Sequence, residues 1–315
     1  MLDSSPVSGS LERSSLNIRA AAKVNLGLEV LGKRADGYHE LSTILMAVDL
    51  SDHLRLETAP KEISLRVPRG AVPEDQTNLA WRAALLLKEA LGVERGVRIT
   101  LRKTIPVAAG LGGGSSDAAA LLAGLNRLWG LKKDVEFLRG LAVRLGMDVP
   151  FFLSGGTALA TGRGEKLAPV RGAPTLTLVL VNPNFPLSTR EVYQMVPESL
   201  RGDGSRIREL LEALRTGDLR EVGKRLYNTL ESVVEPRYPV IGEIKEALLG
   251  AGALGAALSG SGPTVFGIAR SLAHAQEIRR ALSGAPWSHF IVRTLTGDPI
   301  RFVRTESGRL KSERV

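Results

Sequence analysis

The residues best suited to chemistry are a glycine-rich run followed by two serines. Four glycines fall within positions 110–114, and the serines precede an apolar helical pattern. Glycine lets the backbone take positive φ and approach a ligand closely. The free N–H groups and positive dipole end of the following helix then attract an anion. The sequence therefore predicts phosphate binding by Pro106, Val107, Ala108, Ala109, Gly110, Leu111, Gly112, Gly113, Gly114, Ser115 and Ser116.

Two common phosphate-binding loops do not fit this run. A P-loop has a lysine after its last glycine, where this chain has Ser115. The fingerprint of dinucleotide-binding proteins could start at Gly110, but Ser115 stands where its final glycine belongs. That fingerprint also requires an acidic residue, which binds the ribose, at the end of a second strand; the corresponding positions 130–136 are instead predicted as a loop and the start of a helix. A flexible turn capped by serine before a helix is the alternative that glycine content alone leaves open.

Two further blocks flank this run in a fixed order. The sequence AAAKVNL occupies 20–26, and SGSGPT occupies 259–264. Together with the pattern P-x-x-x-G-L-G-G-G-S-S-D-A-A-A, they resemble the three sequence blocks of the GHMP kinase superfamily. The resemblance implies an α+β fold of two domains, the first like ribosomal protein S5 domain 2 and the second ferredoxin-like. It also implies ATP as phosphoryl donor, with Mg²⁺.

Two other stretches narrow the resemblance within the superfamily. They are RADGYH at 34–39 and DVPFF at 148–152. They resemble a branch that phosphorylates the 2-hydroxyl of a cytidine-diphosphate-linked methylerythritol, a step of the non-mevalonate isoprenoid route. The resemblance runs from about residue 17 to about residue 303. Kinases of the mevalonate or homoserine type are the nearest alternative.

Phosphoryl transfer to an alcohol requires a proton acceptor and positive charge beside the reacting groups. The resemblance makes Asp148 the candidate base and Lys23 its charged partner. Lys23 and Asn25 are two residues apart on a predicted strand, so they share a face at roughly 6.5–7 Å and both could line one substrate pocket. The alternatives are a helix cap for Asp148, because Val-Pro follows it, and a solvated lysine for Lys23.

The cytidine half of the site is expected around Tyr38 and His39, which resemble the family's cytidine-binding residues. An aromatic ring can stack on cytosine, and an imidazole can bond to its polar edge. Tyr193 is a candidate second stacking partner, and Thr189 a candidate substrate contact. Without the resemblance, Tyr38 could instead pack in the core and His39 cap a turn.

Three smaller predictions complete the site. Asn78 resembles a residue near the nucleotide, although it could equally begin a helix. Ser116 is a candidate Mg²⁺ ligand. The turn formed by Gly260, Ser261 and Gly262 is expected to pack against the glycine run and close the site; a tight turn without ligand contact is the alternative.

The elements that must position these residues follow from periodicity. Alternation over 18–31 predicts a half-buried strand with Lys23 and Asn25 on its polar face. Other strands are predicted at 41–50, 53–57, 63–67, 97–101, 176–181, 265–268 and 290–295, with strand, turn and strand over 151–160. Helices are predicted at 78–91, 117–129, 134–145, 188–194, 207–215, 219–226, 240–251 and 274–283.

The domain organisation is predicted from composition and these elements. We expect a disordered leader at 1–15, an N-terminal ATP-binding domain at 16–168, a C-terminal GHMP kinase domain at 169–305 and a basic tail at 306–315. The junction is placed in the Gly/Pro-rich stretch 162–174.

Composition excludes several classes. The absence of cysteine excludes disulfides, thiolate catalysis and Cys-based metal sites. The four histidines lack metal-ligand spacing. No apolar run approaches the ~20 residues that span a bilayer, and no signal-peptide core is visible, so we expect a cytoplasmic protein without a membrane partner.

The net charge of +9 suits anionic ligands. A basic RNA-binding protein on a similar fold is the alternative from another class, but arginines interleaved with aromatics are lacking, so no nucleic-acid partner is expected. The presence of both Lys23 and Asp148 argues against a catalytically silent relative. We expect a monomer or weak homodimer.

Overall fold

The computed structural model describes residues 15–69, 72–306 and 309–313, which form two sheets. The strands are β1 Ser15–Lys33, β2 His39–Ala59, β3 Ile63–Arg66, β4 Gly96–Arg102, β5 Thr157–Gly162, β6 Lys166–Pro169, β7 Thr177–Asn182, β8 Tyr227–Asn228, β9 Ala256–Leu258, β10 Val265–Ala269, β11 Ser288–Arg293, β12 Ile300–Glu306 and β13 Arg309–Glu313. In the first sheet the order is β13-β12-β1-β2-β4-β3; β5 joins β2, β6 joins β5, and β8 joins β1.

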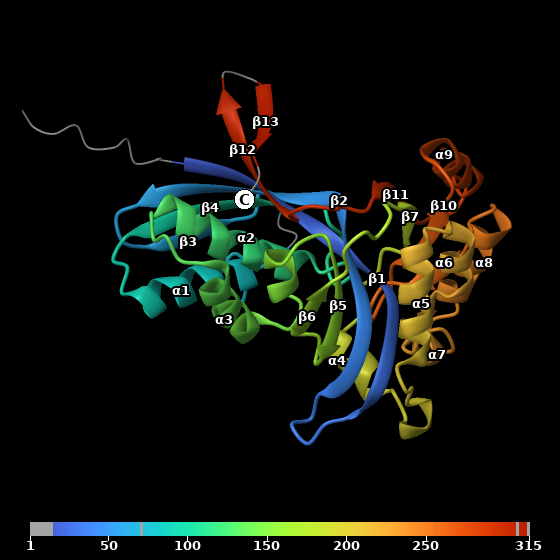
Figure 1. The fold of residues 1–315 in the computed structure, drawn as a ribbon. Helices are drawn as coiled ribbons and strands as arrows, with labels where there is room; N and C mark the ends of the chain where they lie inside the picture. Colours follow the sequence, from blue (N-terminus) through green and yellow to red (C-terminus); the bar gives the residue numbers. More distant parts are fainter. Residues whose placement is uncertain (1–14, 70–71, 307–308, 314–315) are drawn as a thin grey trace, which may run out of the picture.

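Helices cover both sheets. They are α1 Leu79–Leu91, α2 Gly113–Leu128, α3 Val135–Leu145, α4 Thr189–Gln194, α5 Ser205–Thr216, α6 Leu219–Lys224, α7 Glu231–Val234, α8 Val240–Gly250 and α9 Leu272–Ala281, with 3₁₀ turns η1 Pro150–Leu153 and η2 Glu198–Leu200. Figure 1 shows α1, α2 and α3 together against the first sheet, and α5 to α9 gathered around the second. The mixed helix-and-sheet class is as predicted.

The second sheet has the order β11-β7-β10-β9. When β7, β9, β10 and β11 are numbered 1 to 4, the strand order is 4-1-3-2, and helices follow the first and third of these strands. This is the ferredoxin-like arrangement. Residues of α5 pack on one face of the sheet, and residues of α8 and α9 pack on the other. The chain then leaves β11 and returns to the first sheet, where β12 pairs with β1.

Helix α2 lies close to the first sheet because its inner face is small. Ala118, Ala119 and Ala120 are fully buried. A Cβ at Gly124 would lie 2.5 Å from Ile18 Cδ1 and 2.7 Å from Leu56 Cδ1, so a larger residue there would require these two side chains to move. This close packing fixes where the helix N-terminus lies, and the glycine run leads directly into it.

The prediction that β1 is half-buried was wrong. Lys23 and Asn25 are each only 4% exposed, like the apolar residues of the opposite face. Their face is covered by parts of the chain far away in sequence: Lys23 N–H bonds to Leu111 O, and a Cβ at Gly27 would meet Leu210 of α5. Alternation indicates two chemically different faces; here the polar face contacts other protein groups rather than water.

Three other element predictions need correction. The strands predicted at 41–50 and 53–57 are one strand, β2, because the chain continues through Ser51 without a turn. Residues 151–153 belong to the 3₁₀ turn η1 rather than a strand; Pro150 begins it, and Phe151 and Phe152 are buried. A short buried apolar run does not distinguish these structures. Helix α2 begins at Gly113, before the predicted start at Asp117.

The ends of the chain bear on two predictions. The predicted leader falls almost wholly on residues 1–14, outside the described residues. Within the predicted tail, residues 309–313 form β13, which pairs with β12. Among the helices that the structure describes, none has the length and apolar character needed to cross a membrane.

Candidate active site

The glycine run forms a loop that enters α2. Ala108, Gly110 and Gly112 take φ values of +51°, +74° and +69°. Gly112 is the N-cap residue of α2, and no side chain caps the helix there. The loop is held against the first sheet by the bond from Lys23 N–H to Leu111 O, at 2.9 Å. This arrangement leaves N–H groups of the first helical turn free for an anion.

The turn at 259–264 packs directly on this loop. Ser259 Oγ donates to Gly110 O at 3.0 Å, and Thr264 N–H donates to Ala109 O at 3.4 Å. Asn228 holds this turn, because its Nδ2 donates to Gly260 O at 2.8 Å. The predicted packing is therefore present, and contact of Gly260, Ser261 or Gly262 with a ligand remains a prediction.

Lys23 lies at the centre of the site. Its Nζ is 2.5 Å from Asn25 Oδ1, 3.0 Å from Gly110 O and 3.5 Å from Asp148 Oδ2. The shared face of Lys23 and Asn25 is thus confirmed, and the alternative of a solvated lysine is excluded by its burial. One ammonium group contacts the loop, the strand and the carboxylate at once.

Asp148 faces solvent on one side of this ammonium, with its side chain 38% exposed. It does not cap η1: the cap position is Val149, and no side chain bonds to the turn there. The helix-cap alternative for Asp148 is therefore wrong. A carboxylate that touches a buried ammonium and remains open to solvent can accept a proton from a bound alcohol.

Asn25 is oriented by Thr43, a residue that sequence reasoning missed. Asn25 Nδ2 donates to Thr43 Oγ1 at 2.9 Å, and Thr43 Oγ1 donates to Gly27 O at 2.6 Å. The carbonyl oxygen of the Asn25 amide is thereby turned toward Lys23.

Two of the aromatic residues predicted for the substrate, His39 and Tyr193, contact each other. The rings of His39 and Tyr193 are 5.5 Å apart between centroids. Burial, and the negative charge of nearby Asp148, raise the pKa of the Tyr193 phenol. Burial, and then the charge of Lys33, lower the pKa of His39, which favours the neutral imidazole. The structure thus brings His39 and Tyr193 together, and the charge of Asp148 acts on Tyr193.

Tyr38 lies at the β1–β2 hairpin and is 50% exposed, so the alternative of a core tyrosine is wrong. Asp36 Oδ1 accepts its backbone N–H at 3.2 Å, and Gly37 takes a φ of +84° in the same turn. The guanidinium of Arg163 lies over the Tyr38 ring, 5.1 Å from its centroid. Sequence reasoning missed Arg163, which lies in the turn between β5 and β6.

The remaining predicted residues lie around the loop. Thr189 Oγ1 is 2.8 Å from Ser261 Oγ, which joins the start of α4 to the turn. Asn78 caps α1: its side chain accepts from Ala80 N–H at 2.9 Å and donates to Pro73 O at 2.8 Å. Its helix-start alternative is therefore realised, and a contact with nucleotide remains a prediction.

A buried charged cluster, also missed, lies behind the loop. It consists of Asp52, Lys103 and Asp117, and its lysine contacts both carboxylates. Burial, reinforced by the charge of Asp52, raises the pKa of Asp117 to about 7. Next to it, Ser116 Oγ is buried without a hydrogen-bond partner. The direct neighbours of Asp52 and Lys103 in the sequence are polar, so no local signal indicated that these charges are buried.

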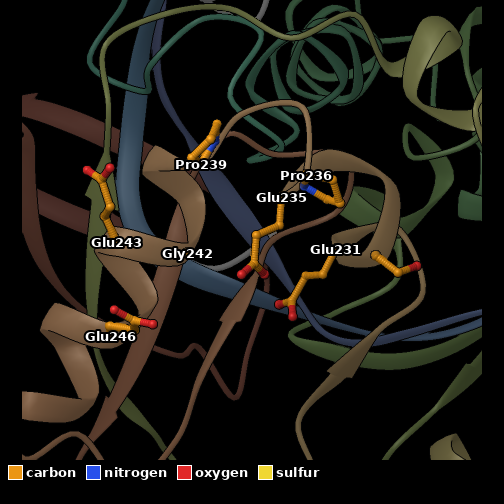
Figure 2. Close-up of a pocket in the computed structure, with 8 residues that line it drawn as sticks. Glu231, Glu235, Pro236, Pro239, Gly242, Glu243 and Glu246 are labelled. Carbon is orange, nitrogen blue, oxygen red and sulfur yellow. The ribbon is translucent and has the colours of Figure 1, made fainter.

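Another hollow in the structure has different chemistry. Figure 2 shows it beside α7 and α8, where Glu231, Glu235, Glu243 and Glu246 line it. Four carboxylates repel phosphate groups, and no predicted site residue lies there. The candidate site is therefore the one around Lys23.

Comparison with protein families agrees with this arrangement. The model described as GHMP kinases N terminal domain matches residues 78–156, and the model GHMP kinases C terminal matches residues 210–289. The first match contains the glycine loop and Asp148, and the second contains the turn at 259–264.

Curated relatives extend the similarity to most of the chain. The chain is 47% identical to the 4-diphosphocytidyl-2-C-methyl-D-erythritol kinase of Pelotomaculum thermopropionicum, over 82% of this chain and 91% of that protein. It is 46% identical to the kinase of the same name from Geobacter metallireducens, over 89% of this chain and 99% of the relative.

Solved structures are similar as well. A crystal structure of 4-(cytidine 5'-diphospho)-2C-methyl-D-erythritol kinase superposes with a TM-score of 0.78 at 38% identity, covering 89% of this chain and 99% of that one. Homoserine kinase from Cytophaga hutchinsonii gives 0.75 at 22% identity, covering 94% and 100%. The second likeness shows the fold alone.

Proposed function

The chain belongs to the GHMP kinases and, among them, to the 4-diphosphocytidyl-2-C-methyl-D-erythritol kinases; from this premise we propose how its residues carry out the reaction. It is an ATP-dependent phosphotransferase with an alcohol acceptor. The acceptor proposed is the 2-hydroxyl of 4-diphosphocytidyl-2-C-methyl-D-erythritol, in non-mevalonate isoprenoid biosynthesis. The mevalonate and homoserine alternatives are disfavoured by the identities to relatives of that one name.

One observation carries the proposal: Lys23 Nζ contacts Gly110 O of the loop and lies 3.5 Å from Asp148 Oδ2. The loop is the proposed site for the ATP phosphates, and the charge of Asp148 is near enough to raise the pKa of Tyr193, whose ring lies 5.5 Å from that of His39. In this proposal the ammonium lies between the donor and acceptor halves. Phosphoryl transfer depends mainly on such positioning and on charge stabilisation.

The proposed step uses these groups as follows. The substrate 2-hydroxyl gives its proton to the Asp148 carboxylate while its oxygen forms a bond to the γ-phosphorus. The bond from that phosphorus to the β,γ-bridging oxygen breaks, and ADP leaves. Lys23 stabilises the negative charge that develops on the transferring group, and Asn25 Oδ1 holds the ammonium in place.

Substrate selection is assigned to the aromatic residues. Tyr38 offers an exposed ring face, and Tyr193 offers a second ring next to His39. A neutral imidazole can both donate and accept a hydrogen bond, which suits the polar edge of cytosine. Thr189, placed by Ser261, is proposed to contact the substrate near the turn.

The nucleotide half comprises residues 106–116, with Asn78 at the start of the neighbouring helix. Mg²⁺ is proposed to accompany ATP and would neutralise phosphate charge. Ser116 Oγ, a hard oxygen that is buried without a hydrogen-bond partner, is the side-chain atom proposed to hold such an ion. No cluster of three acidic or histidine side chains able to hold a metal occurs among the described residues, so ATP phosphates would supply other ligands.

We further propose the domain division at 168/169, cytoplasmic action without nucleic acid or membrane, and a monomer or weak homodimer. The chain passes from β6 in the first sheet to β7 in the second close to that division. Size-exclusion chromatography with light scattering tests the oligomeric state.

The function is tested by measuring ADP release with ATP and Mg²⁺ in the presence of each candidate alcohol. Turnover is expected with the CDP-linked methylerythritol and not with mevalonate or homoserine. A preference for either of the latter would overturn the substrate assignment.

A further inference from the structure

The buried cluster of Asp52, Lys103 and Asp117 flanks the glycine loop. The three side chains are 0%, 7% and 3% exposed. Lys103 Nζ donates to Asp117 Oδ2 at 2.7 Å and to Asp52 Oδ2. They come from three elements: Asp52 lies in β2, Lys103 directly after β4, and Asp117 in the second turn of α2. None of them lies in the loop itself.

The cluster contacts the chain on both sides of the loop. At the entry, Asp52 Oδ1 accepts the N–H groups of Thr104 and Ile105 at 2.6 and 3.0 Å. At the exit, Asp117 immediately follows Ser116. Lys103 bridges the two carboxylates, so the residues before position 106 and after position 116 are tied to one ammonium group.

The same ammonium also lies beneath the first turn of α2. A Cβ at Gly113 would be only 3.2 Å from Lys103 Nζ. The N–H groups proposed to bind phosphate therefore begin directly above the cluster. A change in the cluster can alter their position without touching ATP.

Burying three charges is costly, and well-packed apolar side chains would stabilise a core at least as well. Stability alone is therefore a poor reason for the cluster, whereas ion pairs of fixed geometry can hold one arrangement. We propose that Asp52, Lys103 and Asp117 are positioning residues that hold the two ends of the glycine loop in the geometry that binds the ATP phosphates. This inference rests on the proposed role of residues 106–116.

The test compares Michaelis constants for the two substrates. In Lys103→Met the bridge is lost; in Asp117→Ala only the exit tether is lost, and the neutral Asp52–Lys103 pair survives. Each variant is expected to lower kcat/KM for ATP by about 10- to 100-fold, because a shift of ~1 Å in a binding group has effects of this size. The KM for the CDP-linked substrate is expected to stay within about threefold of wild type, because its proposed site lies across Lys23.

Two controls separate positioning from instability. Asp117→Asn keeps an oxygen that accepts from Lys103, so it should retain most of the wild-type kcat/KM for ATP. Leu138→Ala removes core packing in α3 without touching the loop; it should lower the thermal midpoint while leaving both KM values unchanged. If Lys103→Met does not fold, the positioning role is tested by comparing kcat/KM for ATP between Asp117→Ala and Asp117→Asn.

A third variant tests the underlying function. Ser115→Asp adds negative charge to the loop and should raise the KM for ATP if the loop binds phosphates. If Ser115→Asp has no effect, the proposed function of the loop fails. Two outcomes would refute the positioning role while leaving the loop function intact, provided that Ser115→Asp raises the KM for ATP. In the first, Asp117→Ala lowers only the thermal midpoint, as Leu138→Ala does; in the second, Asp117→Ala raises the KM values for both substrates equally.

Discussion

The contact between loop and turn makes Gly110→Ala an informative substitution. Gly110 has a φ of +74°, and a Cβ there would lie 2.1 Å from Ser259 O. A carbon and a carbonyl oxygen approach no closer than about 3.3 Å even in favourable contacts. The loop and turn must therefore separate by roughly 1 Å, and the bond from Ser259 Oγ to Gly110 O must distort.

The magnitude has two parts that can be separated. Alanine in the left-handed region costs about 1–2 kcal/mol of stability. The ~1 Å displacement of a phosphate-binding group is expected to lower kcat/KM about 10²-fold, equivalent to about 2.7 kcal/mol in the barrier. Gly172→Ala is the matched control, because Gly172 also has a φ of +74° but no atom within 4 Å of the added Cβ.

The assay is steady-state ADP release with each substrate varied in turn, together with thermal unfolding. Both variants should lose similar stability, and only Gly110→Ala should lose activity. If Gly110→Ala retained activity within about threefold of Gly172→Ala, the loop–turn contact would have no part in forming the site.

Three further predictions follow from the same geometry. Asp148→Asn should reduce kcat at least ~10²-fold with the fold intact, and near-normal turnover would exclude its role as base. Because burial and then the charge of Lys33 lower the pKa of His39, its imidazole is mainly neutral at pH 6.5 and gains a proton only at lower pH. Protonation removes the acceptor nitrogen proposed to bond to cytosine, so the wild-type KM for the CDP-linked substrate should rise as the pH is lowered below 6.5, and that of His39→Gln should not. Arg163→Ala should raise the KM for the CDP-linked substrate about two- to fivefold, because the Tyr38 ring loses a cation–π contact of ~0.5–1 kcal/mol. Calorimetry with CDP measures the corresponding loss of affinity.

Sequence reasoning predicted the parts of the site that depend on local pattern. The two-residue spacing of Lys23 and Asn25 fixed their common face, and the glycines indicated where the backbone would take positive φ. The helix caps Asn78 and Asp134 are also local features, and both were foreseen as helix starts.

The parts that could not be predicted depend on contacts between distant segments. Burial of the polar face of β1 requires α5 and the turn at 259–264, which lie some 180–240 positions later in the chain. The partners of Lys103 are 51 and 14 residues away, and no periodicity connects them. Arg163 reaches Tyr38 only because β5 pairs with β2.

The pairing of β1 has a mechanical consequence. This one strand joins β12 near its start and β8 toward its end, and it pairs with β2 along most of its length. Lys23 lies between those two attachments, because β12 pairs with residues 17–20 and β8 with Gly27 and Leu28. All three partner strands belong to the first sheet, but β8 comes from the C-terminal part of the chain, so pulling that part away would break the pairing of Gly27 and Leu28 with Tyr227 and Asn228. The position of Lys23 therefore depends on both a strand near the C-terminal end of the described chain and a strand that precedes it in the C-terminal part, because β12 and β8 hold the same strand on either side of this residue.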